Sequence, residues 1–195
     1  MAWARNGTPD TLSSAGDTLS ITDLTAKKFN QIISHMIASG SLTTNLNIEN
    51  DSSGKHAYRI SLADGTDATA TNSNQVQITG ASVGDDFVIG YMSNISGEEK
   101  LAIMFTAETN TAGTTTAPYR TESAVKYAVT SGQVTRIDLE NSHGSGNYDT
   151  NSNLTVLTGD ETETTRAVQD GTIFEETDTN KAYIWNATSQ TWTQL

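Results

Sequence analysis

The stretch DDFVIGYMSNISGEEKLAIMFTAE, Asp85 to Glu108, decides the fold. Apolar residues recur in it at every second position, first from Phe87 to Tyr91 and again from Leu101 to Phe105. A period of two is the pattern of a β-strand, so two strands are expected here. The polar sequence SGEE, Ser96 to Glu99, separates the two runs and predicts a hairpin turn.

Similar short runs continue on both sides of this hairpin. They are SLTTNLNIE (41–49), AYRISL (57–62), QVQIT (75–79), PYRTESAVKYAVT (118–130), QVTRIDLE (133–140) and NLTVLT (153–158). Two longer polar stretches, Asp64–Asn74 and Glu108–Pro118, have little to bury and are expected to be surface loops. About eight strands separated by polar turns predict an all-β protein, an antiparallel β-sandwich of the jelly-roll-like kind.

One segment, ITDLTAKKFNQIISHMIASG (21–40), has a different period. Phe29, Ile32, Ile33 and Met36 recur at the spacing of a helix, and Gly40 is placed to end it. An N-terminal helix is therefore expected, packed either on its own sheet or against copies of itself. Residues 1–20 are polar and predict an extended arm, in which Trp3 packs on its own domain or on a neighbouring subunit.

The chain ends in GTIFEETDTNKAYIWNATSQTWTQL, Gly171 to Leu195. TIFEET, KAYIWN and TWTQL predict three short strands of a small β appendage. If they pair in sequence order, four aromatic rings share one face: Phe174, Tyr183, Trp185 and Trp192. The expected organisation is an arm and helix over 1–40, a β-sandwich over 41–159 and the appendage over 160–195.

Composition narrows the classes of function. The net charge of −12 opposes binding to nucleic acid and to anionic membranes. The chain has no cysteine, which excludes disulfides, thiolate metal sites and cysteine nucleophiles. No apolar stretch of signal-peptide or membrane-spanning length is seen. The hydrophobic share of 35% indicates a thin core whose exposed rings need a partner to cover them.

Catalytic and metal motifs are weak. The histidines are isolated in sequence, no GxSxG elbow occurs, and the many carboxylates are expected to form a solvated acidic face, so the chain is not expected to be an enzyme. No cofactor is expected. The best calcium candidate is the set Asp149, Asn151, Asn153 and Asp160. Leu154 stands where the calcium loop needs glycine, and an Asx-rich turn is the alternative reading.

The C-terminal motif supplies a resemblance. The pattern G-T-x-F-E-E-T-D-T-x-K-x-Y-x-W, read from Gly171 to Trp185 and followed by Trp192, resembles an element of structural proteins in tailed phages and environmental viruses. There it occurs in head fibres, decoration proteins and tail-associated proteins. The opening, Ala2–Phe29, is similar to the start of small virion proteins of marine phages. The resemblance implies a structural protein of the virion, assembled in the host cytoplasm, and implies no catalytic residue.

The expected function is that of an oligomeric, surface-exposed virion component, either capsid decoration or a head fibre. Its partners would be further copies of itself, with a trimer favoured, and other virion proteins such as the major capsid protein. The alternative is a tail-associated or receptor-binding module that recognises host surface glycans. The residues expected to contact copies or the particle are Trp3, Phe29, Ile33, Met36, Phe174, Tyr183, Trp185 and Trp192.

Overall fold

The computed structural model of the protein describes residues 3–63, 65–80, 84–109, 111, 113–159, 171–176, 181–186, 188–189 and 191–195. The chain divides into two compact units. The main body is Trp3–Gly159, and the described part of the C-terminal unit lies between residues 171 and 195. Every strand pair is antiparallel, so the prediction of an all-β protein with antiparallel sheets is confirmed.

The larger sheet of the main body has eight strands in the order β1-β12-β3-β8-β9-β10-β5-β6. Their bounds are β1 Ala4–Thr11, β3 Phe29–Met36, β5 His56–Ser61, β6 Asp67–Ser73, β8 Asp86–Ser93, β9 Lys100–Glu108, β10 Tyr119–Tyr127 and β12 Asn153–Gly159. The β8–β9 pair is the hairpin predicted from the sequence. Buried Lys100 closes this hairpin, because its ammonium donates to the carbonyl oxygens of Ile95 and Glu98 at 2.8 and 2.5 Å.

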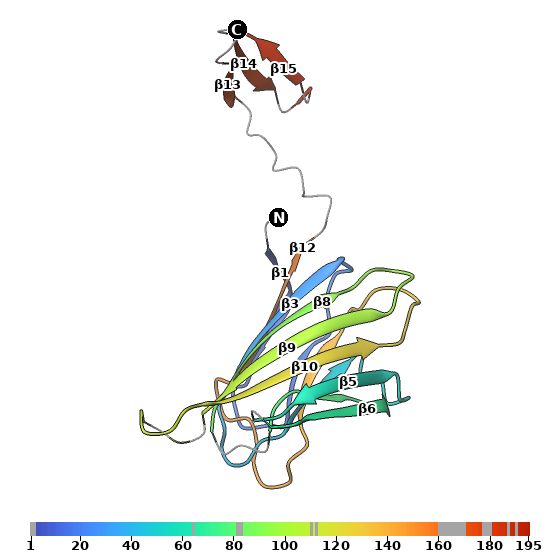
Figure 1. Ribbon diagram of the computed structural model, residues 1–195, viewed down its shortest axis with the longest axis vertical. Helices are drawn as coiled ribbons and strands as arrows, with labels where there is room; N and C mark the ends of the chain where they lie inside the picture. The colour runs from blue at the N-terminus through green and yellow to red at the C-terminus, as the bar shows by residue number, and fades with distance from the viewer. Residues whose placement is uncertain are drawn as a thin grey trace. The chain divides into compact units, whose positions relative to one another are not determined.

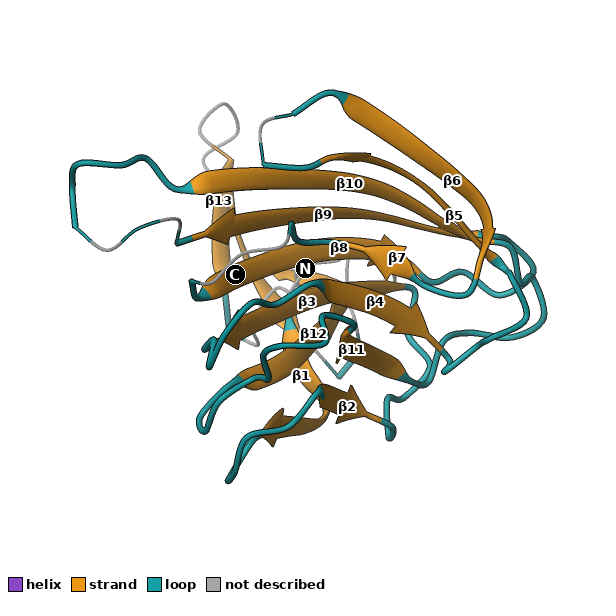
Figure 2. Cartoon of the chain, turned by 90° about the horizontal axis from the view of Figure 1, so that it is seen from below, coloured by secondary structure: helices purple, strands orange, loops and turns teal. Residues whose placement is uncertain are grey.

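The smaller sheet has four strands in the order β2-β11-β4-β7. Their bounds are β2 Thr18–Ile21, β4 Thr44–Ile48, β7 Val76–Gln77 and β11 Ile137–Asn141. One core of buried side chains lies between the two sheets, with Ile32 and Val156 from the large sheet and Leu46 and Leu139 from the small one. This is the arrangement of a β-sandwich, and Figure 2 shows the two sheets as its layers.

The strand pairs of the main body are nested. β1 pairs with β12 and β2 with β11, and inside them β3 pairs with β8, β4 with β7 and β5 with β6. From β1 to β5, consecutive strands lie in alternate sheets. β9 and β10 widen the large sheet between β8 and β5 (Figure 1). The chain therefore runs as long hairpins that are rolled across both sheets.

The predicted N-terminal helix is wrong, because its central residues form strand β3 in the middle of the large sheet. Ile32 and Met36 point into the core, while Phe29 and Ile33 lie on the opposite face. A strand that is apolar on both faces loses its period of two and imitates helical spacing. No residue of the described part is helical, and hence no described helix has the length and hydropathy to cross a membrane.

Two further expectations are corrected. The predicted arm over 1–20 contains β1 and β2, so residues 3–40 belong to the same unit as the rest of the sandwich. The predicted loop Asp64–Asn74 contains β6, an edge strand of small and polar residues. An edge strand has one paired neighbour and little to bury, so the sequence of β6 lacks the apolar signal that marks the central strands.

The described part of the C-terminal unit is a three-stranded sheet in the order β13-β14-β15. The strands are β13 Ile173–Glu176, β14 Lys181–Asn186 and β15 Thr191–Gln194. They pair in sequence order, as predicted.

Candidate contact surfaces and binding sites

The face of the large sheet that points away from the core carries large apolar side chains. On β9, Leu101, Ile103 and Phe105 are 57%, 52% and 40% exposed. Ala102 and Met104, which alternate with them, are buried in the core. Successive side chains of a strand point to opposite faces, so β9 is apolar toward both the core and the solvent.

These side chains join those of the neighbouring strands into one surface. Ile33 of β3 is the direct partner of Ile89 on β8, and Ile89 is the partner of Phe105 on β9. Tyr91 of β8 is the partner of Ile103. Side chains of direct cross-strand partners lie about 5 Å apart and touch. The apolar surface is therefore continuous across three strands.

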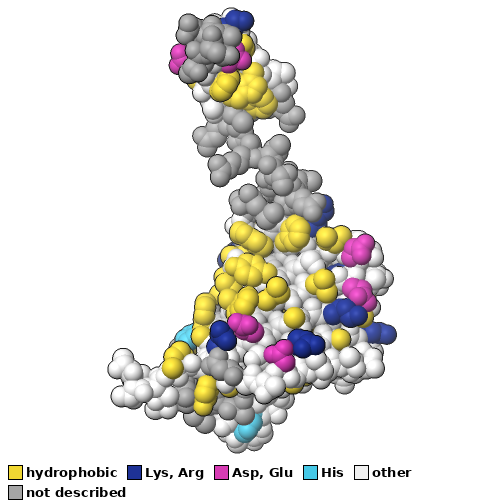
Figure 3. Space-filling model, viewed as in Figure 1, with side chains coloured by type: hydrophobic (Ala, Val, Ile, Leu, Met, Phe, Trp, Pro, Cys, Tyr) yellow, Lys and Arg dark blue, Asp and Glu magenta, His cyan; other side chains and the backbone are white. Residues whose placement is uncertain are grey.

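The N-terminal tryptophan extends this surface. The Trp3 ring meets the Tyr91 ring edge to face at 6.4 Å, and Trp3 stays 39% exposed. We call this surface the outer apolar face; it consists of Trp3, Ile33, Phe87, Ile89, Tyr91, Leu101, Ile103 and Phe105. Figure 3 shows apolar side chains gathered on the near side of the main body. Their exposed part amounts to roughly 600 Å², at the upper end of what single soluble domains leave uncovered.

Charged pairs of both signs border the outer apolar face on β5, β6 and β10. The ion pairs are Arg59–Asp67 at 3.3 Å, Arg120–Glu122 at 3.5 Å and Lys126–Glu99 at 3.5 Å. All of these side chains are largely exposed, so each pair adds little stability. A hollow of about 250 Å³ lies where Ile103 and Phe105 meet Arg59 and Asp67. The face thus has an apolar centre and a mixed-charge edge.

Three of the predicted contact residues lie on or beside this face. Trp3 and Ile33 belong to it, and Phe29 is half-buried on the same side of β3. Met36 is a correction, since its side chain is fully buried in the core and is unavailable to a neighbour. The alternation of β3 places Met36 inward and Ile33 outward, whereas a helix would have placed both on one stripe.

Six residues of the outer apolar face were not predicted from the sequence as contact residues: Phe87, Ile89, Tyr91, Leu101, Ile103 and Phe105. Their signal is present in the opening stretch, where both alternating sets of positions contain apolar residues. A half-solvated antiparallel sheet normally shows polar residues on one set. When both alternating sets of positions in such a strand are apolar, the outer face of the sheet is therefore an exposed apolar surface.

The C-terminal sheet carries the four predicted aromatic residues on one face. Phe174 is the direct partner of Tyr183, and Trp185 is the direct partner of Trp192. The ring centroids of these pairs are 6.4 and 5.3 Å apart. Together with Glu176, Phe174, Tyr183 and Trp192 line an open hollow of about 500 Å³. Phe174 and Trp192 stay half-exposed, so within this unit the rings form a platform for a further group.

A pair of buried carboxyl groups closes one end of the sandwich. Asp86 and Glu108 are direct partners on β8 and β9, and both are almost fully buried. Glu108 Oε1 accepts hydrogen bonds from the Gly80 amide and the Thr121 hydroxyl. No described residue donates to either oxygen of Asp86. Burial, and then the charge of Glu108, raise the pKa of Asp86 to about 8.

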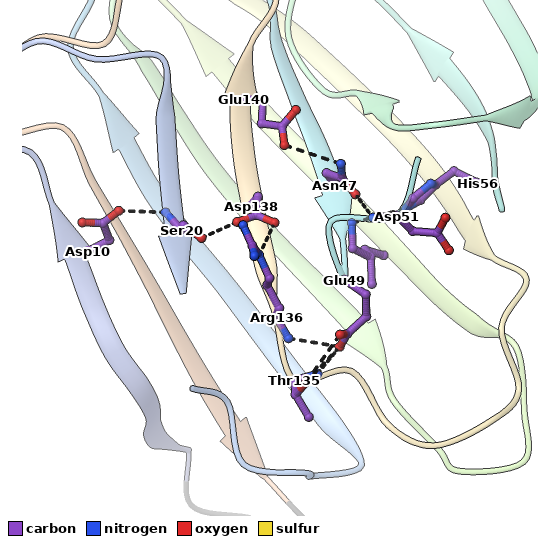
Figure 4. A network of polar contacts seen from close by, with 11 residues as sticks. Asp10, Ser20, Asn47, Glu49, Asp51, His56, Thr135, Arg136, Asp138 and Glu140 are labelled. Carbon is purple, nitrogen blue, oxygen red and sulfur yellow. Dashed lines mark hydrogen bonds and ion pairs between the residues drawn. The ribbon is translucent and has the colours of Figure 1, made fainter. Parts of the chain in front are cut away.

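The outer side of the small sheet is polar, in contrast to that of the large sheet (Figure 4). Arg136 Nε donates to buried Asp138 at 2.8 Å, and this hydrogen bond raises the pKa of the Arg136 guanidinium. The Ser20 hydroxyl donates to Asp138, and the Ser20 amide donates to Asp10 at 2.7 Å. Asp138 is therefore paired with a cation, and Asp10 accepts a hydrogen bond from a neutral donor within the chain.

The calcium candidate is a turn followed by a strand. Asp149 Oδ1 accepts from the Thr150 amide at 2.7 Å, and Asn151 takes a left-handed backbone conformation with φ of 73°. Asn153 already begins β12, which carries the chain roughly 20 Å away before Gly159. Asp160 lies outside the described residues. No group of three or more potential metal ligands is found in the part that the structure describes.

Comparisons with known proteins identify no family for this chain. No protein-family model matches it, and no curated protein matches it. Among solved structures, a mutant of alginate lyase Aly36B in complex with alginate tetrasaccharide is similar over 77% of this chain and 79% of that one. The identity there is 10% and the TM-score is 0.26. A likeness at that level carries no argument about function.

Proposed function

We propose that this chain is a structural component of a phage-like virion that assembles into oligomers on the particle surface, as capsid decoration or a head fibre. The observation that carries the proposal is the outer apolar face. Its partners are further copies of the chain, with a trimer the state we favour, and other virion proteins such as the major capsid protein. The C-terminal motif, with its resemblance to virion proteins, is the second support.

The size of the outer apolar face supports a protein partner. A standard protein interface covers about 800 Å² on each side, and this face exposes roughly 600 Å² of large apolar side chains. The face bears no charge at its centre, whereas the chain as a whole carries −12. Copies of an acidic chain repel each other least where they meet through an uncharged surface. The pairs of both signs at its edge suit contact between identical copies.

We propose that the sandwich is of the jelly-roll-like type. The nested pairs β1–β12, β2–β11, β3–β8, β4–β7 and β5–β6 support this description, because a jelly roll is a long hairpin rolled across two sheets. β9 and β10 are the departure, since they add two strands to one sheet only.

Replacing one exposed residue of the face tests self-association. Ile103→Lys places a charge at the centre of the outer apolar face, and because Ile103 is 52% exposed the fold should tolerate it. We expect the wild-type chain to be an oligomer by light scattering after size-exclusion chromatography, and Ile103→Lys to be a monomer. The matched control, Ser13→Lys, adds the same charge to an exposed position in the loop between β1 and β2 and should leave the mass unchanged.

A wild-type chain that stays monomeric at every concentration contradicts the self-association part of the proposal. The virion part is tested on particles purified from cultures that carry the gene. Mass spectrometry should find the chain at a fixed ratio to the major capsid protein, and electron microscopy should place it on the outside. Particles that lack the chain would refute the virion role while leaving self-association intact.

Carbohydrate recognition is the second candidate, and the aromatic hollow of the C-terminal unit favours it. Half-exposed Phe174 and Trp192 offer flat apolar surface, and Glu176 is a hydrogen-bond acceptor beside them. On a glycan array, Trp192→Ala should lose most of any signal, whereas Ile103→Lys should keep it. A wild-type chain that binds no glycan, or a Trp192→Ala variant that binds as well as wild type, removes this candidate.

A further inference from the structure

A polar cleft opens on the side of the small sheet, away from the outer apolar face. Its volume is about 600 Å³, and all of the residues that line it are polar. The side chains that matter are Asn47, Asn50, Asn72, Asn74, Gln75 and Glu140. They come from β4, the β4–β5 loop, β6, the β6–β7 turn and β11. The fold thus collects five carboxamides and one carboxylate from five separate segments; we call this site the amide cleft.

The backbone around the amide cleft holds unusual conformations. Asn50 and Asn72 both have a left-handed backbone with φ of 52°. The β4–β5 loop packs closely on β6, since a Cβ on Gly54 would lie 3.1 Å from the Asn72 carbonyl oxygen. Asparagine tolerates the left-handed region better than most residues, so two asparagines can hold these positions and still present a side-chain amide.

The amide side chains of the cleft fall into two groups. Some are held by hydrogen bonds within the chain, and others are available to a ligand. Asn47 is buried; its Oδ1 accepts from the Asp51 amide at 2.9 Å, and its Nδ2 lies 3.5 Å from Glu140 (Figure 4). Within the described part of the chain, the side chains of Asn50, Asn72 and Asn74 make no hydrogen bond, and all three residues are exposed. Asn47 and Glu140 form the floor, and the available amides form the rim.

The chemistry of the lining selects the ligand. A carboxamide offers a donor and an acceptor in one plane, and a hydroxyl group is also both a donor and an acceptor. Several carboxamides on a concave surface therefore match a compound with several neighbouring hydroxyls. None of the residues that line the cleft is cationic, and the chain carries −12, so phosphates and acidic sugars are disfavoured. No aromatic ring lines the cleft, so an apolar ligand gains nothing there.

We propose that the amide cleft binds an uncharged saccharide through its hydroxyl groups, with Asn50, Asn72 and Asn74 as the recognising side chains and the Glu140 carboxylate as an acceptor. The site lies away from the outer apolar face and shares no residue with the aromatic hollow. It therefore stands whether or not the chain assembles on a particle.

The test is a titration of the full chain with neutral trisaccharides: maltotriose, chitotriose and β-1,3-linked laminaritriose. Side-chain amide signals of Asn50, Asn72 and Asn74 should shift in heteronuclear NMR spectra, with a dissociation constant on the order of 1 mM for a shallow polar site. Asn72→Gly combined with Asn74→Ala should weaken binding at least tenfold, since each of the two substitutions removes one recognising amide. Glycine is chosen at Asn72 because it keeps the left-handed backbone without strain.

Asn153→Ala is the matched control, because it removes an asparagine amide on β12, which lies six strands away from β6 in the large sheet, and should leave the affinity unchanged. Far-UV circular dichroism and the melting temperature check that each variant is folded. The absence of shifts at all three asparagines up to about 50 mM sugar overturns the proposal. If the chain binds an acidic saccharide and none of the neutral ones, the assignment to an uncharged saccharide is wrong. Equal affinity in the double variant and the wild type overturns the assigned residues.

Discussion

At the scale of single residues, burial decides which carboxyl groups affect the stability of the fold. Asp86 and Asp138 are both fully buried, yet among the described residues only Asp138 has a cation beside it. Arg136 Nε donates to both carboxylate oxygens of Asp138. No described residue donates to Asp86, and Glu108 across the strand repels its charge. A carboxyl group in that position keeps its proton, because an isolated buried charge is far more costly than a neutral acid.

The free energy of unfolding should therefore depend on pH through Asp86. The pKa of this group rises from 3.8 to about 8 on folding, so between about pH 4 and about pH 8 the folded state holds one more proton than the unfolded state. The contribution of Asp86 to the free energy of unfolding is fully present below about pH 4 and is lost as the pH rises through about 8. The loss should total a few kcal/mol, at no more than about 1.4 kcal/mol per pH unit.

The measurement is urea unfolding of the wild type and Asp86→Asn at a series of pH values. Asparagine is close in size and cannot titrate, so the difference between the two curves isolates Asp86. The difference in the free energy of unfolding, wild type minus variant, should fall steadily as the pH rises to about 8 and should level off above that pH. Parallel curves would mean that the carboxyl group is ionised in the folded protein.

At the scale of elements, β3 shows why one segment was misassigned. Ile32, Ser34 and Met36 face the core, and Ile33 faces the outer side beside Ile89. Two adjacent isoleucines favour a strand by propensity, but the spacing of the apolar residues fits both structures. Pairing with β8 and β12, which come from distant parts of the chain, resolves the ambiguity. The single-sequence pattern has no access to those partners.

Gly40 has a different role from the predicted one. It was expected to end a helix, whereas it lies where the chain after β3 passes the loop before β12. A Cβ on Gly40 would lie 2.7 Å from the Ser145 carbonyl oxygen and 3.0 Å from the Gly146 Cα. Both neighbours are backbone atoms and cannot rotate away. Glycine is therefore required for close approach of two chain segments.

Gly40→Ala should lower the free energy of unfolding by about 1–3 kcal/mol, since the two segments must separate to admit the methyl group. The control is Gly144→Ala in the same loop, where an added Cβ meets no atom within 4 Å. Chemical unfolding of both variants gives the comparison. If the Gly144 and Gly40 variants are equally stable, the backbones do not approach as closely as described.

At the scale of the whole molecule, two opposing interactions act on the self-association that we propose. The outer apolar face favours contact between copies, and the net charge of −12 opposes it. Salt weakens the charge repulsion and leaves the apolar contact in place, because the screening length falls from about 30 Å at 0.01 M salt to about 3 Å at 1 M. Assembly should therefore be favoured by salt.

Sedimentation velocity at fixed protein concentration tests this balance. Between about 0.01 M and about 0.5 M sodium chloride the oligomer fraction of the wild type should rise. Ile103→Lys should remain monomeric across the range, because it removes the apolar contact and not the overall repulsion. An oligomer that dissociates as salt is added would show that ion pairs, and not the outer apolar face, hold the copies together.

The sequence by itself determined the all-β class, the β8–β9 hairpin and the shared face of Phe174, Tyr183, Trp185 and Trp192. Each of these follows from local alternation and turn chemistry within a few residues. Only the tertiary structure decided that residues 29–36 are a central strand, that Met36 is interior while Ile33 is exterior, and that Asn50, Asn72 and Glu140 line one cleft. Those features depend on which strands become neighbours, and neighbours in a rolled sandwich lie up to about 150 residues apart in the chain.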